Sequence, residues 1–104
     1  MREISITELQ NLKIGQAENA QAGTGCTVFL LGENGAPVGL DVRGGGPASR
    51  ESELLKPTAA AQVIHAILLG GGSAFGLDAA GGVMRYLEER CIGFDVGVTK
   101  VPLV

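Results

Sequence analysis

Serine, histidine and cysteine are among the residues of this chain that could supply a nucleophile or a base, and one serine stands in an unusual setting. Ser73 lies within residues 70–82, a run that holds six glycines in thirteen residues. So many glycines cost conformational entropy, so close packing or a ligand must require their backbone geometry. The alanine-rich pattern that follows predicts a sharp turn opening a helix, with Ser73 as the helix cap.

The glycine run matches none of the motifs in which glycines serve known chemistry. A P-loop needs a lysine after its last glycine, and none follows here. A dinucleotide-binding fingerprint and a nucleophile elbow each need a glycine where this chain has Phe75. The fingerprint also needs a preceding strand, whereas the stretch before Gly70 is expected to be helical. We therefore expect Ser73 to cap a helix rather than to act as a nucleophile.

The single histidine and the two cysteines do not complete a catalytic or metal-binding set. His65 is expected in the middle of a helix, as a partly buried residue rather than a base. Cys26 and Cys91 lack the spacing of a zinc site and are expected to be free thiols in a reducing cytoplasm. The sequence therefore predicts no metal site and no cofactor.

The overall composition limits the class of protein. The 104 residues give at most one domain with a modest core, and 45% hydrophobic with 18% charged residues is typical of a globular protein. The net charge of −3, without a basic cluster, argues against binding to nucleic acid. No apolar run has the length of a membrane span, and the N-terminus lacks a signal-peptide pattern.

The N-terminal part is expected to form an antiparallel meander. Residues 12–17 and 26–31 have the composition of strands, with a loop over 18–24. Asn-Gly at 34–35 predicts a tight hairpin whose second strand is 38–42. Residues 1–10 are expected to be a lead-in anchored by three apolar side chains, Ile4, Ile6 and Leu9.

The C-terminal part is expected to contain two helices. Thr58 predicts the start of the first, and the second covers residues 74–90. Residues 93–98 are expected to form a strand or turn, and 100–104 leave the chain extended. The apolar face predicted for the first helix consists of Ala60, Val63, Ile64, Ile67 and Leu68. A long irregular connection, 43–57, precedes it and is expected to be solvated or fixed by ion pairs of Arg43, Arg50 and Glu51.

Several short segments, in their order, resemble the N-terminal part of the P1 (S58) peptidase family. That family includes L-aminopeptidase/D-esterases of the DmpA type, β-peptidyl aminopeptidases and endo-type 6-aminohexanoate oligomer hydrolases. The segments that carry the resemblance are 22–28, 41–45, 50–57, 65–67 and 71–80.

The resemblance implies an α+β fold, the N-terminal part of an αββα sandwich of the N-terminal-nucleophile-like type. Members of the family cleave their own precursor and expose a Ser or Thr, whose hydroxyl attacks while its own α-amino group serves as the base. No segment of this chain matches that nucleophile region. Residues 1–104 are therefore expected to be the N-terminal fragment of a single hydrolase domain. The fragment alone should be inactive, and the remainder of the same precursor should complete it.

Within the fragment, Gly71, Gly72 and Ser73 are the expected substrate-binding residues, because glycine backbone permits close approach of a ligand. Close packing of helix and sheet, with no ligand contact, is the alternative. The resemblance implies a peptide or amide substrate, and an apolar strand edge at 101–104 predicts homo-oligomerisation. An ornithine acetyltransferase-like enzyme, or a non-catalytic module for small-molecule binding or assembly, are the other functions considered.

Overall fold

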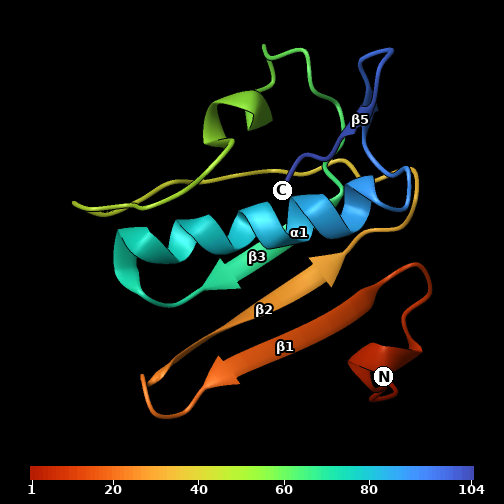
Figure 1. The fold of residues 1–104 in the computed structure, drawn as a ribbon. Helices are drawn as coiled ribbons and strands as arrows, with labels where there is room; N and C mark the ends of the chain where they lie inside the picture. Colours follow the sequence, from red (N-terminus) through yellow and green to blue (C-terminus); the bar gives the residue numbers. More distant parts are fainter.

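Three antiparallel strands form the main sheet of the computed structural model, which describes residues 1–104. Helix α1 crosses one face of this sheet, and a small two-stranded sheet lies near the C-terminus (Figure 1). The fold is thus a small mixed α/β domain, as the expected α+β class requires. The elements in chain order, with η marking a 3-10 helix, are η1 (Ile6–Glu8), β1 (Lys13–Asn19), β2 (Thr24–Leu30), η2 (Ser52–Leu55), β3 (Ala66–Gly70), η3 (Ser73–Asp78), α1 (Ala79–Glu88), β4 (Phe94–Asp95) and β5 (Lys100–Val101).

Strands β1 and β2 form a tight hairpin. Their register runs from Lys13 opposite Leu30 to Asn19 opposite Thr24. The side-chain oxygen of Asn19 accepts a hydrogen bond of 3.0 Å from the Ala22 N–H, and Gly23 adopts a positive φ of 63°. This turn holds the hairpin closed. Both expected strands are confirmed, although they extend into the stretch that was expected to be a loop.

The hairpin predicted at Asn34–Gly35 is wrong. Gly35 does sit in a turn, with its N–H bonded to the Gly32 carbonyl and a φ of 67°. Residues 38–42, however, form no strand. Ala36 instead forms an antiparallel bridge with Ile64, with two backbone hydrogen bonds of 2.9 and 3.0 Å. A tertiary partner therefore takes the place of the local one.

The helix predicted through residues 60–68 is also wrong, and Thr58 caps no helix. Ala66–Gly70 is strand β3, which pairs antiparallel with β2. A short apolar run fits either a helix face or a buried strand, and here pairing with β2 decides the outcome. The second predicted helix is confirmed in place, although its first turns, η3, are a 3-10 helix. The irregular connection 43–57 is confirmed, apart from the single turn η2.

The two faces of β3 differ sharply in burial. Ala66 faces the side on which α1 packs and is fully buried, whereas Leu69, on the other face, is 59% exposed. Phe29 of β2 lies between Ile14 and Ile67 in the ladder, so the three side chains form an apolar row on that second face. We call this surface, made of Ile14, Phe29, Ile67 and Leu69, the open face.

The buried core is correspondingly small. Ile4, Ile6 and Leu9, predicted to anchor the N-terminal lead-in, are each about half exposed, so that prediction is wrong. Only six of the 104 residues are buried: Ile64, His65, Ala66, Ala80, Leu87 and Pro102.

No helix of the protein has both the length and the apolar character needed to cross a membrane.

Candidate functional site

The glycine run forms the turn between β3 and the helical layer. Strand β3 ends at Gly70, and the Gly71 N–H donates to the Gly25 carbonyl at 2.9 Å, so the turn stays joined to β2. Gly72 then adopts a φ of 89°, and the chain enters η3 and α1. A strand, and not the expected helix, precedes the glycines. The dinucleotide-binding fingerprint still fails, because Phe75 occupies its last glycine position.

Two of these glycines lie very close to neighbouring atoms. A Cβ on Gly71 would lie 2.6 Å from the hydroxyl oxygen of Thr24. A Cβ on Gly76 would lie 1.8 Å from the carbonyl oxygen of Gly71, which is far inside van der Waals contact. The turn therefore packs against the β1–β2 hairpin and against itself. Packing alone is sufficient to require glycine at position 76, where the obstructing atom is backbone, whereas at position 71 it is a side-chain hydroxyl.

Ser73 is the strained residue of the turn. It has a φ of 58°, a region that residues other than glycine seldom occupy. The cap residue of η3 is Gly72 and no side chain caps that helix, so the prediction that Ser73 is the cap is wrong. Ser73 is exposed and has no side-chain hydrogen bond to any base. Backbone strain of this kind gathers at binding and catalytic sites, which keeps Ser73 a candidate contact residue.

The structure divides the three predicted site residues between two cavities. Gly71 and Gly72 border an open cavity of about 1000 Å³ at the end of the β1–β2 hairpin. Ser73 borders a separate groove of about 480 Å³, which we call the edge groove. The edge groove follows β3, η3 and the connection 43–57, and Val104 also contributes to its lining. The turn thus separates a polar hollow from an apolar groove.

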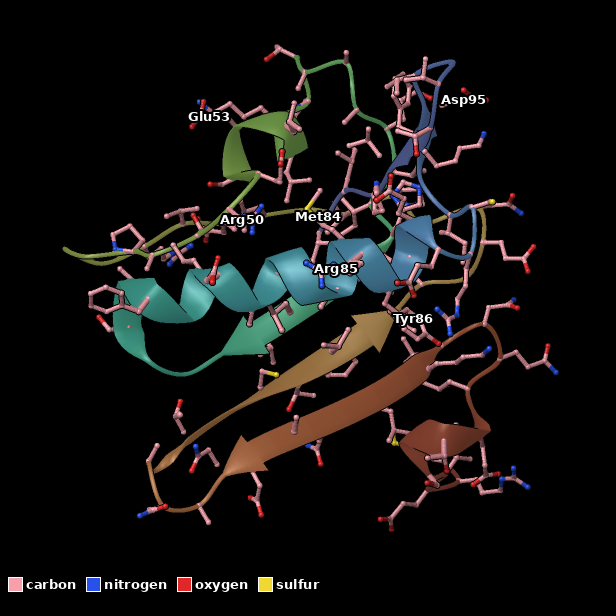
Figure 2. The ribbon with its side chains drawn as sticks, viewed as in Figure 1. Arg50, Glu53, Met84, Arg85, Tyr86 and Asp95 are labelled. Carbon is pink, nitrogen blue, oxygen red and sulfur yellow. The ribbon has the colours of Figure 1, made fainter.

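Arg50 is the one charged side chain that lines the edge groove. Its guanidinium reaches across to the helical layer, where it donates to the Leu77 carbonyl at 3.3 Å and to the Met84 sulfur at 3.6 Å (Figure 2). Arg50 therefore anchors the connection 43–57 on α1. The predicted ion pairs of this loop are found only for Arg43, which pairs with Asp41, while Glu51 makes none.

His65 is buried, with 4% of its surface exposed, and is not part of a helix. Its Nδ1 accepts a hydrogen bond of 3.1 Å from the Leu103 N–H, so the ring is neutral and carries its proton on Nε2. Burial lowers the pKa of His65 from its ordinary value. The histidine therefore holds the C-terminal segment in place and is not paired with a nucleophile.

The other reactive or charged groups do not gather into a catalytic centre. Cys26 and Cys91 are free thiols, as predicted, and line different cavities. No group of three or more His, Cys, Asp or Glu side chains is placed to hold a metal ion. The hydrogen bond from Lys100, with help from the Gly97 N–H, lowers the pKa of Asp95, which pairs with Lys100 at 2.8 Å. These contacts stabilise the β4–β5 turn.

These features define a mixed α/β domain that has a glycine-rich turn from strand to helix but no nucleophile–base pair of its own. A family model described as Peptidase family S58 matches residues 5–104. The chain belongs to this peptidase family, as the order of its motifs predicts.

Proteins of mycobacteria are among its relatives. One from Mycobacterium tuberculosis (strain ATCC 25618 / H37Rv), named an uncharacterized aminopeptidase, is 41% identical over 109 residues, covering 96% of this chain and 31% of that protein. A protein of the same description from Mycobacterium leprae (strain TN) is 39% identical over 107 residues, covering 96% and 30%. The chain thus spans less than a third of the length of these curated relatives.

Proposed function

We propose that residues 1–104 form the N-terminal part of a self-processing aminopeptidase or amidohydrolase whose Ser or Thr nucleophile lies outside this segment. The observation that carries the proposal is the family match over residues 5–104, in a segment that contains no nucleophile–base pair. The aminopeptidase description of relatives at 41% identity supports the same reaction class. The substrates to screen are peptides, together with the substrate classes of the enzymes that the sequence resembles: β-peptides, D-amino acid esters and 6-aminohexanoate oligomers.

The open face supports the proposal that the complete domain is an αββα sandwich. In such a sandwich, helices cover one face of each sheet and the two sheets pack together through their other faces. Helix α1 packs against one face of β3, while the apolar row Ile14, Phe29 and Ile67 lies on the other face of the sheet. The remainder of the precursor would supply the second sheet, so that both parts form one domain. We also propose that the complete protein is a homo-oligomer.

Intact-mass spectrometry of the complete protein, purified from its full reading frame, tests self-processing. The expected result is two polypeptides whose masses sum to that of the precursor, with the second beginning at Ser or Thr. Replacing that residue by Ala should leave one uncleaved chain and abolish hydrolysis of amino acid p-nitroanilides. A single chain with full activity would contradict self-processing.

Acetyl transfer from N-acetylornithine to glutamate, measured on the same sample, separates the hydrolase from an ornithine acetyltransferase-like enzyme. Hydrolysis without transfer is the expected result. A protein with neither activity against the whole substrate panel would favour the non-catalytic binding or assembly module.

We further propose that the turn formed by Gly71, Gly72 and Ser73 borders the substrate site of the complete enzyme. The positive φ of Ser73 and the two cavities that lie on either side of this turn support the proposal. Ser73→Ala should raise KM several-fold and leave the midpoint of thermal unfolding within about 2 °C of wild type. Ser52→Ala, at the start of η2, is the matched control and should leave KM unchanged. An unchanged KM for Ser73→Ala would exclude substrate contact by its hydroxyl.

A further inference from the structure

Strand β3 is an edge strand whose outer side has unpaired backbone groups. The sheet order is β1-β2-β3, so β2 pairs with one side of β3 only. At one end of the β2–β3 ladder the Leu31 N–H donates to the His65 carbonyl, and at the other end the Gly71 N–H donates to the Gly25 carbonyl. Hydrogen-bonded pairs alternate with non-bonded pairs in an antiparallel ladder. The backbone groups of Ile67 and Leu69 therefore point toward β2, where they face Phe29 and Thr27. The N–H and C=O groups of Ala66, Leu68 and Gly70 therefore point outward, toward the edge groove.

The segment near Val104 already begins to pair with this outer edge. The carbonyl of Leu103 accepts from the His65 N–H at 2.8 Å and from the Ala66 N–H at 3.4 Å. Val104 lies in the edge groove together with Ala66, Leu68 and Gly70. In Figure 1 the chain leaves β5 and reaches its C-terminal end while heading the same way as the β3 arrow. A strand that continued this path would run parallel to β3.

His65 makes this entry possible. In a parallel ladder, the Leu103 N–H would bond the carbonyl of Ile64, but that carbonyl already accepts from Ala36 at 2.9 Å. Leu103 instead donates to Nδ1 of His65 at 3.1 Å. The imidazole thus takes the place of a backbone acceptor at the start of the ladder.

We infer that the residues directly following Val104 in the full-length protein form a fourth strand, parallel to β3, whose register His65 and Leu103 set. Continued in steps of two, the ladder gives the first residue after Val104 a hydrogen bond to the Ala66 carbonyl and one from the Leu68 N–H. The third residue after Val104 donates to the Leu68 carbonyl and accepts from the Gly70 N–H. This segment spans 31% of the length of the Mycobacterium tuberculosis relative, and its proposed N-terminal position, on which the inference rests, places the remaining chain after Val104, where it can fill the groove. The inference concerns how the sheet continues, and it does not depend on self-processing or hydrolysis.

Hydrogen exchange in the full-length protein, resolved to single amides by mass spectrometry, tests whether the edge is covered. The N–H groups of Leu68 and Gly70 should exchange at least about 100-fold more slowly than unstructured amides, as should those of Ile67 and Leu69. Fast exchange at Leu68 and Gly70, beside protected Ile67 and Leu69, would overturn the inference. His65→Leu should speed exchange of the Leu103 amide, because its acceptor is lost.

Disulfide trapping in the same protein tests which segment covers the edge, and in which direction. Ile67→Cys is combined with a cysteine at the first position after Val104, in a background carrying Cys26→Ala and Cys91→Ser. Neighbouring strands lie about 4.8 Å apart, within the Cα separation of a disulfide. The disulfide should form, because both side chains face the same side of the sheet.

The matched control places the new cysteine one position later, where its side chain faces the opposite side of the sheet. This control should give less than one tenth of the cross-linked product. A disulfide with the later position only, or none at either position although Leu68 is protected from exchange, would overturn the assignment of segment and register. Hydrolytic activity plays no part in either readout, so the inference and the proposed function can fail separately.

Discussion

The two faces of strand β3 are built from the same kinds of residue but have opposite surroundings. On the α1 side, Ala66 is fully buried and the nearby Leu87 of α1 is 1% exposed. On the open face, two residues along the strand from Ile67, Leu69 leaves 59% of its surface in contact with water. The comparison shows that the two faces differ in burial and not in hydrophobicity. An apolar face that is exposed in this way is typical of a surface that another surface covers.

The largest expected effect comes from shortening a buried side chain on the α1 side of the sheet. Leu87→Ala in the full-length protein should lower the free energy of unfolding by about 3–5 kcal/mol, because it leaves a cavity among well-packed neighbours. Urea unfolding followed by circular dichroism measures the change.

Leu69→Ala, on the open face, tests the other side of the comparison. If the remainder of the protein covers the open face, its cost should approach that of Leu87→Ala. A cost below about 0.5 kcal/mol would mean that the face stays in water.

The glycine run offers the next contrast, between a packed and an open glycine. Gly76→Ala should destabilise by about 1–3 kcal/mol, because its Cβ would lie 1.8 Å from the Gly71 carbonyl oxygen. Gly81→Ala, in α1, meets no atom within 4 Å and should stabilise by about 1 kcal/mol through helix propensity. Thermal unfolding of both variants, side by side, checks the opposite signs. Equal effects would mean that close approach does not shape this turn.

A smaller effect should appear as a pH dependence of stability that comes from the buried His65. Burial holds the pKa of His65 below its value in the unfolded chain, so on acidification the unfolded state takes up the proton first. Stability should therefore fall as the pH drops below about 6.5, by at most about 1.4 kcal/mol per pH unit, and level off once folded His65 is protonated. His65→Gln should flatten this part of the pH profile in urea unfolding. A profile with the same slope in that variant would assign the effect to other groups.

The smallest effect is expected at the exposed β4–β5 turn. Hydrogen bonds from Lys100 and Gly97 lower the pKa of Asp95, so its contribution is present above about pH 3.8 and is lost as the pH falls through the folded value. Asp95→Asn should shift the unfolding midpoint at pH 7 by less than Gly81→Ala does, because water and salt screen the pair. The shift should shrink further in 0.5 M NaCl. A salt-independent loss would indicate a structural role for the turn.

The sequence predicted elements well where local chemistry decides them. The β1–β2 strands and the helical segment after Ser73 follow from composition and spacing. It failed at Ile64, where the 3.6-residue pattern of apolar residues suggested a helix, although β2 and Ala36 hold that stretch extended. It failed again at Gly35, because a turn signal identifies a turn but not the partner of the strand that follows. Long-range pairing is what the sequence pattern lacks.

The candidate site was less predictable than the fold. The family relation was readable from the order of short motifs, and the free thiols from their spacing. The anchoring contacts of Arg50 with Leu77 and Met84 left no sequence signal, because they join residues 27 and 34 positions apart. The bond between His65 and Leu103 spans 38 positions and was missed for the same reason.

The small core also has a consequence in time. Ribosomes add about 5–20 residues per second, from the N-terminus onward. If this segment is the N-terminal part of a protein of the mycobacterial relatives' length, as proposed above, more than twice as much chain follows it as it contains. For on the order of ten seconds or more, the β1–β2–β3 sheet would therefore emerge with Ile67 and Leu69 still in water. During that interval the nascent chain would present an uncovered apolar surface, and its folding yield should depend on how quickly the rest is made.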